Sequence, residues 1–443
     1  MLNNKKQIPI TLLILFFFII SCSNDKLGEI QDLYNLEKYE QALILLNDID
    51  KKKFDKSDDF VIIAKVKWKN EQLEEAFIDI NKAVELNPKS SQAYNYRGVI
   101  KNSLGNIKGA LKDYDKAIEL DPKNSEAYYN RGYINMKENI TNKESVLKDI
   151  NKVLELNPKN SKAYELRGFL KKTFRDKEGA LEDYNKAIEI NPKSSSAYRL
   201  IGDIKEYSGD EKEALENYNK AAELNPKSSK TYRLRGNLKE NLGDKEGALK
   251  DYNKAIEFDP KNSKAYSFRA YLKENLGDKE GSLKDYNKLI ELDPKNSRAY
   301  SFRGIIKDYL GNYKDALKDY NKAIELDSTN SMGYSCRGNI KNSLGDKKGA
   351  LKDFNKAIEI NPKNSWTYCS RGIIKESLGD KEDALNDYNK AIEINPKNSR
   401  AYYNRGLLHK NHLNNLNNAC NDWSKAGELG FMEAYSQIKK HCK

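Results

Sequence analysis

Prolines recur along this chain at a nearly fixed step, and that step constrains the fold more than any other feature. From residue 88 onward the step is 34 residues, apart from one step of 36 and one missing proline at Ser328. The prolines are Pro88, Pro122, Pro158, Pro192, Pro226, Pro260, Pro294, Pro362 and Pro396. A period of this size is typical of a repeat array, in which each unit packs only against its neighbours. This period predicts that the 443-residue chain forms a repeat array and not one globular core.

The unit Ser91–Asn124 shows what one repeat encodes. Tyr94 and Leu104 lie at helical spacing and predict a first helix, which Gly105 ends because glycine accepts the left-handed conformation of a helix end. A second apolar stripe follows and stops at Pro122, since proline cannot continue a helix. The stripe consists of Ala110, Leu111, Tyr114, Ala117 and Ile118. Each repeat is therefore expected to be an antiparallel pair of helices.

Five residues of this unit resemble the tetratricopeptide repeat family in their order and spacing. They are Gly98, Ala110, Tyr114, Ala117 and Pro122. Glycine at position 98 is expected where the second helix, with its small Ala110, comes close. Arg97 and Lys101 depart from the commonest family pattern and resemble a bacterial subtype. The resemblance implies an all-α, right-handed superhelical solenoid of antiparallel helix pairs, with about 11 repeats over residues 57–432 and a capping helix at 433–443.

The first 21 residues have the make-up of a secretory signal peptide. Lys5 and Lys6 precede an apolar run from Ile8 to Ile20, which is shorter than the ~20 residues that span a membrane. The residues that follow resemble the lipobox of bacterial lipoproteins, which implies cleavage before Cys22 and acylation of Cys22. An uncleaved anchor, or an ordinary signal peptide with an incidental cysteine, is the alternative.

The lipoprotein resemblance also implies a location. Several acyl chains on one residue attach a protein stably to a membrane, so the chain is expected to be a membrane-anchored lipoprotein that faces the periplasm or the cell surface. Ser23 follows the cysteine where an aspartate could stand, which favours the outer membrane. Residues 22–56 are then the lipid anchor and a degenerate first repeat. Lysines around Trp68 are expected to be solvated, and contact with anionic headgroups is the alternative. They are Lys51, Lys52, Lys53, Lys65, Lys67 and Lys69.

Two patterns within the repeats predict local structure. Arg97 and Asp113 recur together along the chain and are both missing from one repeat, which has Ile201 and Asn217 instead. Paired loss indicates an ion pair between the two helices, as opposed to two independent surface charges. The repeat Ser263–Asn296 departs most from the others in its small residues, so a looser joint is expected there. Its substitutions are Ala270, Ser282 and Leu289.

The chain has five cysteines, and Cys22 is assigned to the lipid anchor. Cys420 and Cys442 flank the closing helix, and an oxidising compartment would allow a disulfide between them. Such a bond resembles the ends of some bacterial repeat proteins of this kind. Cys336 and Cys369 lie on the first helices of adjacent repeats, and they are expected to be free thiols near the inner face of the array.

The sequence offers no catalytic, cofactor or metal site. It contains no phosphate-binding loop, dinucleotide fingerprint, nucleophile elbow or zinc motif. His409 and His412 could share a helix face, but no cysteine or carboxylate completes a metal site nearby, so a surface pair is expected. The net charge of +12 suggests nucleic acid, but export and the interspersed acidic residues argue against that partner.

In the family that this chain resembles, the first helices line the inner face of the solenoid. Carried over to this sequence, one row on that face is acidic and includes Glu240, Glu274 and Asp308, and a second row is largely basic and includes Lys230, Lys264 and Arg298. Trp366 lies in the second row, and the interleaved aromatic residues include Tyr207, Tyr271 and Tyr309. Such a face suits an extended protein segment of mixed charge. The expected function is a membrane-anchored scaffold that binds an unidentified protein or peptide. The alternative is a binder of envelope polysaccharide.

Overall fold

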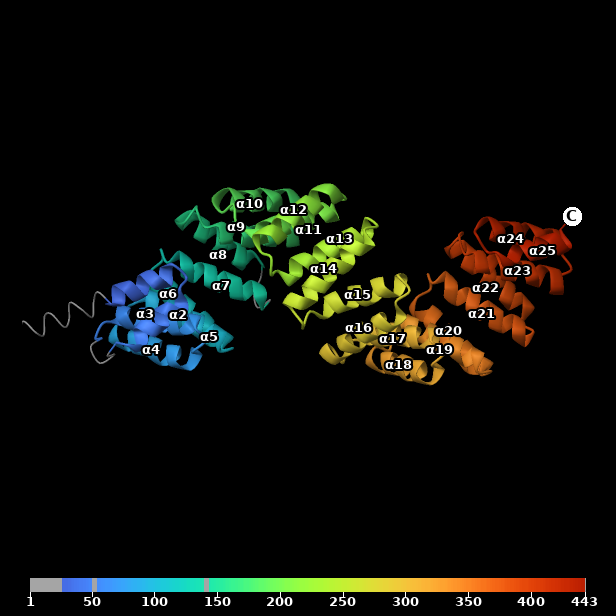
Figure 1. Ribbon diagram of the computed structural model, residues 1–443, viewed down its shortest axis with the longest axis horizontal. Helices are drawn as coiled ribbons and strands as arrows, with labels where there is room; N and C mark the ends of the chain where they lie inside the picture. Colours follow the sequence, from blue (N-terminus) through green and yellow to red (C-terminus); the bar gives the residue numbers. More distant parts are fainter. Residues whose placement is uncertain (1–25, 50–53, 139–142, 443) are drawn as a thin grey trace, which may run out of the picture. The chain divides into compact units, whose positions relative to one another are not determined.

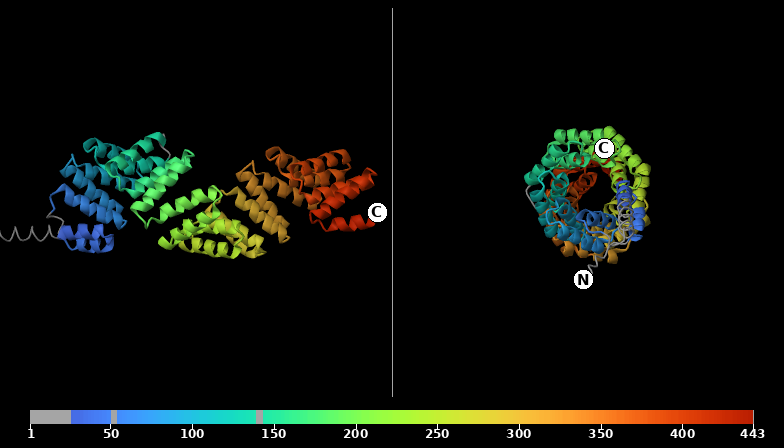
Figure 2. Two further views of the ribbon diagram at one scale, coloured as in Figure 1. Left: turned by 90° about the horizontal axis from the view of Figure 1, so that it is seen from above. Right: turned by 90° about the vertical axis from the view of Figure 1, so that its left-hand side faces the viewer.

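The computed structural model describes residues 26–49, 54–138 and 143–442. The described chain divides into two compact units, one ending at Leu224 and one beginning at Asn225. Each unit is a succession of helices that pack as antiparallel pairs, and no described residue lies in a strand (Figure 1). Figure 2 shows the same succession of pairs from two further directions. The predicted all-α array of helix pairs is confirmed.

Residues 26–35 of the N-terminal unit are helical and pair with α2. The further helices of this unit are α2 (Tyr39–Asn47), α3 (Ser57–Lys69), α4 (Leu73–Leu86), α5 (Ser91–Ser103), α6 (Ile107–Leu120), α7 (Ser125–Lys137), α8 (Lys143–Leu156), α9 (Ser161–Thr173), α10 (Lys177–Ile190), α11 (Ser195–Tyr207) and α12 (Glu211–Leu224). Leu27 and Ile30 pack with Ala42 and Leu46, so the first described pair has its own small core. Residues 1–21 and Cys22 lie outside the described residues.

The C-terminal unit holds six more pairs and a final single helix. Its helices are α13 (Ser229–Asn241), α14 (Lys245–Phe258), α15 (Ser263–Asn275), α16 (Lys279–Leu292), α17 (Ser297–Tyr309), α18 (Tyr313–Leu326), α19 (Ser331–Ser343), α20 (Lys347–Ile360), α21 (Ser365–Leu378), α22 (Lys381–Ile394), α23 (Ser399–His412), α24 (Leu416–Glu428) and α25 (Glu433–His441). The pairs from α3 to α24 number eleven, as the repeat count predicts.

Polar side chains at the repeat boundary set where each helix begins. Asn124 Oδ1 accepts a hydrogen bond from the backbone N–H of Ala127, which makes Asn124 the N-cap of α7. Its Nδ2 donates to Ser91 Oγ at 2.8 Å, and Ser91 Oγ donates to the carbonyl of Ala117 at 2.7 Å. Asn124 therefore caps the first helix of one repeat and, through Ser91, links that repeat to both helices of the repeat before it.

The glycine of the first helix makes room for an aromatic ring. A Cβ atom built on Gly98 would lie 2.6 Å from Cε1 of Tyr114, a distance that no relaxed contact allows. The expectation that the glycine serves a close approach of Ala110 is therefore incomplete, because the tyrosine ring on the second helix is the group that needs the space. Tyr114 is almost fully buried, and it is the largest side chain between the two helices of its repeat.

The predicted ion pair between the two helices of a repeat is confirmed. In α17 and α18 the Arg303 guanidinium donates two hydrogen bonds to the Asp319 carboxylate, at 2.9 and 2.6 Å. The same arrangement joins Arg97 with Asp113, Arg131 with Asp149, Arg167 with Asp183, Arg235 with Asp251, Arg269 with Asp285, Arg337 with Asp353, Arg371 with Asp387 and Arg405 with Asp422. The repeat that lacks the pair buries Ile201, and Asn217 bonds instead within its own helix.

The arginine does more than the sequence pattern indicated. Arg303 Nη1 also donates to Asn287 in the second helix of the preceding repeat, at 2.9 Å. Its guanidinium lies 5.3 Å from the ring centroid of Tyr300, within the range of a cation–π contact. The carboxylate of Asp319 takes a second cation, Lys307, at 2.8 Å. This group of residues therefore fastens the helices of one repeat to each other and to the repeat before it.

The looser joint expected in the repeat Ser263–Asn296 is not present. Ala270, Ser282 and Leu289 are all buried, and α15 packs on α16 as closely as in the other repeats. Tyr286 stacks on Phe302 of the following repeat with ring centroids 5.8 Å apart. All three side chains are larger than the residues usual at these positions, and the pair accommodates them within its core, so that expectation was wrong.

The final helix closes the C-terminal unit. α25 packs on α24 through Trp423 and Ala434, and the Tyr435 hydroxyl donates to the carbonyl of Gly427 at 3.0 Å. The structure places a disulfide between Cys420 and Cys442, which lie 22 residues apart in the sequence. Cys336 and Cys369 are free thiols, and burial raises the pKa of the Cys336 thiol to about 12.

Reduction of this disulfide is expected to release α25 from α24. The bond closes a short loop at the chain end, where α25 packs on α24 alone among the described helices, so backbone exchange in α25 should rise roughly tenfold or more after reduction. Hydrogen exchange with mass spectrometry would measure it, with α23 as the internal control. Thiol counting in denaturant should find two free thiols in the mature protein before reduction and four after it, if Cys22 is blocked. Four before reduction would contradict the disulfide.

Candidate partner-binding face

The first helices of successive repeats lie side by side and form one face of each unit. In the C-terminal unit α13 contacts α15, α17 contacts α19, and α21 contacts α23. The second helices of successive repeats do not approach one another as closely. Each unit is therefore curved toward its first helices, and their outward positions form the inner face.

The structure places the acidic row half-buried near the ends of the first helices. The hydroxyl of Tyr252 donates to Glu240 at 2.8 Å, and Tyr388 donates to Glu376 at the same distance. Tyr218 does the same to Glu206 in the N-terminal unit, at 2.7 Å. In these three repeats the buried tyrosine that fills the space beside the glycine donates to a carboxylate of the inner face.

Glu274 and Asp308 differ from the other acids of the row. The structure shows no hydrogen bond from a described residue to either carboxylate. Burial raises the pKa of Glu274, with Lys279 opposing that effect, and burial also raises the pKa of Asp308. Each is a carboxylate that has lost part of its water without a donor to replace it. A cationic group of a partner would supply that donor.

The basic row lies exposed at the starts of the first helices. Lys230, Lys264, Arg298 and Arg400 are exposed, as are Met332 and Trp366 at the equivalent positions. The acidic row and this row come from opposite ends of the same helices, so the inner face carries opposite charges along its two edges. Within the C-terminal unit both rows lie on the same first helices, one near each end.

Exposed tyrosines stand between the charged positions. Tyr271 and Tyr309 are exposed, and so is Tyr207 in the N-terminal unit. Lys279 Nζ lies 4.4 Å from the ring centroid of Tyr309, and Lys177 Nζ lies 4.1 Å from that of Tyr207. These lysines belong to the second helix of the preceding repeat, and the sequence reasoning missed them. Each holds a tyrosine ring in place while one ring face stays open to a ligand.

A pocket of about 470 Å³ lies on the inner face of the first repeats of the N-terminal unit. Its walls are mostly aromatic and amide side chains, which include Tyr34, Trp68, Tyr96, Asn102, Tyr129, Asn130 and Tyr133. Tyr129 and Tyr133 are stacked, with ring centroids 6.2 Å apart. Asn130 donates to Asn95 at 3.0 Å, and Asn95 donates to Glu126 at 3.2 Å. The walls of this pocket are therefore held by a connected set of side chains.

The expectation that the lysines around Trp68 are solvated is wrong for two of them, and these two are equally unavailable to lipid headgroups. Lys65 is buried between the rings of Tyr34 and Tyr96, with its Nζ 4.7 and 4.8 Å from their centroids. Lys67 is also buried and pairs with Asp79. Lys69 lies over Trp68, at 4.6 Å. Residues 51–53 lie outside the described residues.

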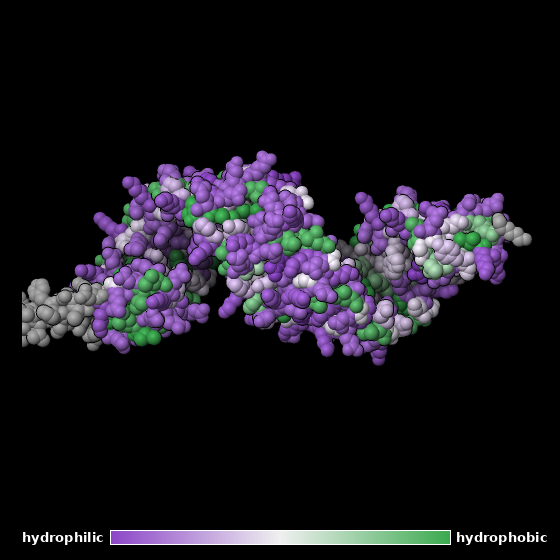
Figure 3. Space-filling model, turned by 45° about the horizontal axis from the view of Figure 1, so that its top comes forward, coloured by the Kyte–Doolittle hydropathy of each residue, from purple (hydrophilic) through white to green (hydrophobic). Residues whose placement is uncertain are grey.

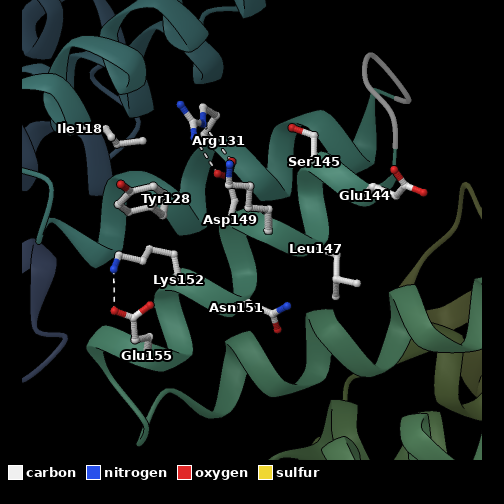
Figure 4. Close-up of a pocket in the computed structure, with 11 residues that line it drawn as sticks. Ile118, Tyr128, Arg131, Glu144, Ser145, Leu147, Asp149, Asn151, Lys152 and Glu155 are labelled. Carbon is white, nitrogen blue, oxygen red and sulfur yellow. Dashed lines mark hydrogen bonds and ion pairs between the residues drawn. The ribbon is translucent and has the colours of Figure 1, made fainter.

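A larger pocket of about 830 Å³ lies beside α8, where the repeat is two residues longer than the others (Figure 4). Figure 4 shows Arg131 paired with Asp149, and Lys152 paired with Glu155, at its walls. Arg131 also pairs with Asp115 at 2.8 Å. These charges belong to the repeating contacts of the stack, so the pocket presents no separate chemistry.

The two histidines do not form the surface pair that the sequence predicted. His409 Nε2 lies 3.8 Å from a carboxylate oxygen of Asp422, and burial lowers the pKa of His409. His412 faces Glu376 at the same distance. Nowhere in the described ranges do three or more His, Cys, Asp or Glu side chains gather so that they could hold a metal ion.

Comparison with known families identifies the repeats. Models of the tetratricopeptide repeat match residues 60–90, 100–138, 161–194, 195–228, 229–262, 263–296, 297–330, 331–364, 354–386 and 375–412. These matches cover most of the chain, so the protein belongs to the tetratricopeptide repeat family. Proteins of this family mediate protein–protein interactions. No curated protein matches the chain at a significant level.

Solved structures share the fold at low sequence identity. The APC/C hetero-tetramer Cut9–Hcn1 contains a chain with 15% identity and a TM-score of 0.52, and the match covers 94% of this chain and 95% of that one. Pseudomonas aeruginosa PilF has 19% identity and a TM-score of 0.43, with 48% and 97% covered. Yeast Tom70 has 17% identity and a TM-score of 0.43, with 88% and 96% covered. The Cut9–Hcn1 match supports the fold alone.

Proposed function

We propose that this protein is a non-enzymatic scaffold, anchored to an envelope membrane by acylated Cys22, that binds a partner protein along the inner face of its repeats. One observation carries the binding part of the proposal. The residues that recur in most copies make the contacts between packed helices, as Gly98, Tyr114 and the Arg–Asp pairs show. On the first helices, the residues that vary between copies lie exposed or half-buried on the inner face. Variation on one face of an otherwise repeated unit fits recognition of a particular partner.

The anchor rests on the sequence of residues 1–22. In the part of the chain that the structure describes, no helix is both long enough and apolar enough to cross a bilayer. The intact mass of the mature protein from a membrane fraction tests the anchor, because it reports both cleavage before Cys22 and the added acyl chains. A chain with its first 21 residues intact in the cytosol would refute the anchor. The proposed site is the periplasmic or outer surface of the envelope, with the outer membrane favoured.

Crosslinking in cells followed by mass spectrometry is the experiment that names the partner. Crosslinks from Lys264 and Lys279 would place it on the inner face of the C-terminal unit. A partner that crosslinks only to lysines at exposed outer-face positions, such as Lys250 and Lys284, would refute that placement.

Charge reversal of the two unpaired inner carboxylates is expected to weaken partner binding. Glu274→Lys with Asp308→Lys should lower affinity roughly tenfold or more, since a like charge replaces a partly desolvated attractive one. Binding should also weaken as the pH falls toward the raised pKa values of these groups, because their protonation removes the same charges. Surface plasmon resonance with the crosslinked partner would measure both effects.

A matched control separates the face from the net charge. Glu257→Lys with Glu291→Lys makes the same change in net charge on exposed second-helix positions. That variant should bind as the parent does. Equal losses in the two variants would mean that long-range charge, and not the inner face, governs binding.

A second candidate, a binder of envelope polysaccharide, is favoured by the 470 Å³ pocket. Aromatic faces such as Tyr133 stack on the apolar side of sugar rings, and amides such as Asn102 and Asn130 can bond their hydroxyls. A cell-wall binding assay with and without Tyr133→Ala separates this candidate from the first. Wall binding that the substitution abolishes would favour the polysaccharide.

A further inference from the structure

Isoleucine occupies one outer-face position in the first two repeats and in none of the others. The position lies two residues after the buried alanine of the second helix. It is Ile44 in α2, after Ala42, and Ile78 in α4, after Ala76. The two isoleucines are 65% and 67% exposed, among the most exposed large apolar side chains of the described chain. Both point away from the stack, because their neighbours Leu46 and Ile80 are fully buried.

The same position is polar in every later repeat. It is Lys112, Lys148, Glu182, Glu216, Lys250, Lys284, Lys318, Lys352, Asn386 and Asn421, and all ten side chains are exposed. The repeats have the same local fold, so packing gives no reason for the difference. A single exposed isoleucine needs no explanation, but two at one register in consecutive repeats point to a common cause.

The two isoleucines lie close to the chain's N-terminal end. The described chain begins at residue 26, four residues after Cys22, and four residues span at most about 14 Å. The helix of residues 26–35 packs directly on α2, so the first repeats cannot be far from an acylated Cys22. Figure 3 shows a mostly hydrophilic face with small separate apolar areas, and one of these areas lies at the N-terminal end of the described chain.

The charges beside the isoleucines indicate the kind of surface that covers them. Glu40 and Glu74 each lie four residues before an isoleucine and therefore on the same side of the helix. The buried Lys65 and Lys67 are not available on this side. Electrostatic attraction to anionic lipid is thus weak, and apolar contact with the boundary between headgroups and acyl chains is the interaction that remains.

We propose that Ile44 and Ile78 rest in the surface of the bilayer that holds Cys22, so that the outer face of the first repeats lies on lipid. The inference depends on the proposed lipid anchor, which confines these repeats to the membrane. Two isoleucines bind a bilayer too weakly to recruit the protein, but they orient a protein that is already tethered. In that orientation the inner face of the same repeats is turned away from the lipid and stays open to a partner.

Quenching by brominated lipid tests the contact. Acylated, full-length mature protein is placed on zwitterionic phosphatidylcholine vesicles with and without bromine on the acyl chains. The variants are Ile44→Trp, Ile78→Trp and the matched control Lys250→Trp, and Trp68, Trp366 and Trp423 give the same background in all. Emission added by the first two substitutions should fall about twofold or more with brominated lipid, because their side chains sit at acyl-chain depth. Emission added by Lys250→Trp should not change.

Further measurements distinguish a failure of the anchor from a failure of the proposed lipid contact. Intact mass and co-sedimentation with vesicles report the anchor by themselves. An acylated, sedimenting protein whose tryptophans at 44 and 78 are quenched no more than the control overturns the inference and leaves the anchor standing. A mature protein without acyl chains overturns both. A dimer in detergent that Ile44→Lys with Ile78→Lys turns into a monomer would show that a second copy covers the isoleucines, which also overturns the inference.

Discussion

Replacing Tyr320 with alanine is expected to cost about 3–5 kcal/mol of unfolding free energy. The ring is completely buried between α17 and α18, and it fills the space beside Gly304, where an added Cβ would lie 2.6 Å from its Cε1. Alanine leaves a cavity that the paired helices cannot close without losing the Arg303–Asp319 contact. Chemical denaturation followed by circular dichroism would show the loss, and hydrogen exchange would place it in α17 and α18. Exchange that rises only elsewhere in the chain would contradict the packing argument.

The chain provides a conservative variant for the same site. Phe354 occupies the equivalent position in α20, and the buried Tyr320 hydroxyl has no carboxylate partner among the described residues and faces only the weakly hydrogen-bonding Cys336 thiol. Asp308 is one methylene shorter than Glu240, the acid that accepts from Tyr252. Tyr320→Phe should therefore leave stability unchanged or raise it slightly, whereas Tyr252→Phe should lower it by about 1 kcal/mol. Equal effects of the two changes would refute the proposed difference in hydrogen bonding.

Arg303→Ala is expected to lower the unfolding free energy by about 2–3 kcal/mol. The substitution leaves the Asp319 carboxylate, which is 5% exposed, with only Lys307 as a cationic partner. It also removes the bond to Asn287 and the contact with the Tyr300 ring. The denaturant midpoint should fall, and exchange should rise in α17, α18 and the preceding α16. An unchanged midpoint would mean that the pair is only a surface contact.

Two further variants make that result specific. Lys322→Ala removes an exposed ion pair with Glu325 in the same helix, and its midpoint should not move measurably. Arg303→Ile with Asp319→Asn copies the natural alternative, Ile201 and Asn217, and should recover much of the loss because it leaves no buried charge unpaired. If the double variant is less stable than Arg303→Ala, then the arginine contributes through its contacts and not through the burial of its partner's charge.

The sequence determined the local rules of the array, because each rule acts over a few residues. A proline every 34 residues and a glycine such as Gly105, at φ 81°, stop helices whatever surrounds them. The joint loss of Arg and Asp at Ile201 and Asn217 revealed the ion pair, since a buried charge rarely survives without its partner. These signals predicted the repeat count and the helix pairs.

The tertiary structure decided which side chains those rules leave free. Lys65 and Lys67 resemble solvated lysines in the sequence, but the fold buries both. Rings of neighbouring repeats cover Lys65, and Lys67 pairs with Asp79 of its own repeat. Glu240 and Glu274 occupy equivalent positions, yet of these two carboxylates only Glu240 accepts a hydrogen bond from a tyrosine hydroxyl. The isoleucines at 44 and 78 fit an apolar helical pattern, and only packing shows that they face outward. Composition and period determine local structure along the chain. The exposure of a side chain depends instead on contacts between repeats, and the candidate sites of this protein are defined by exposed side chains.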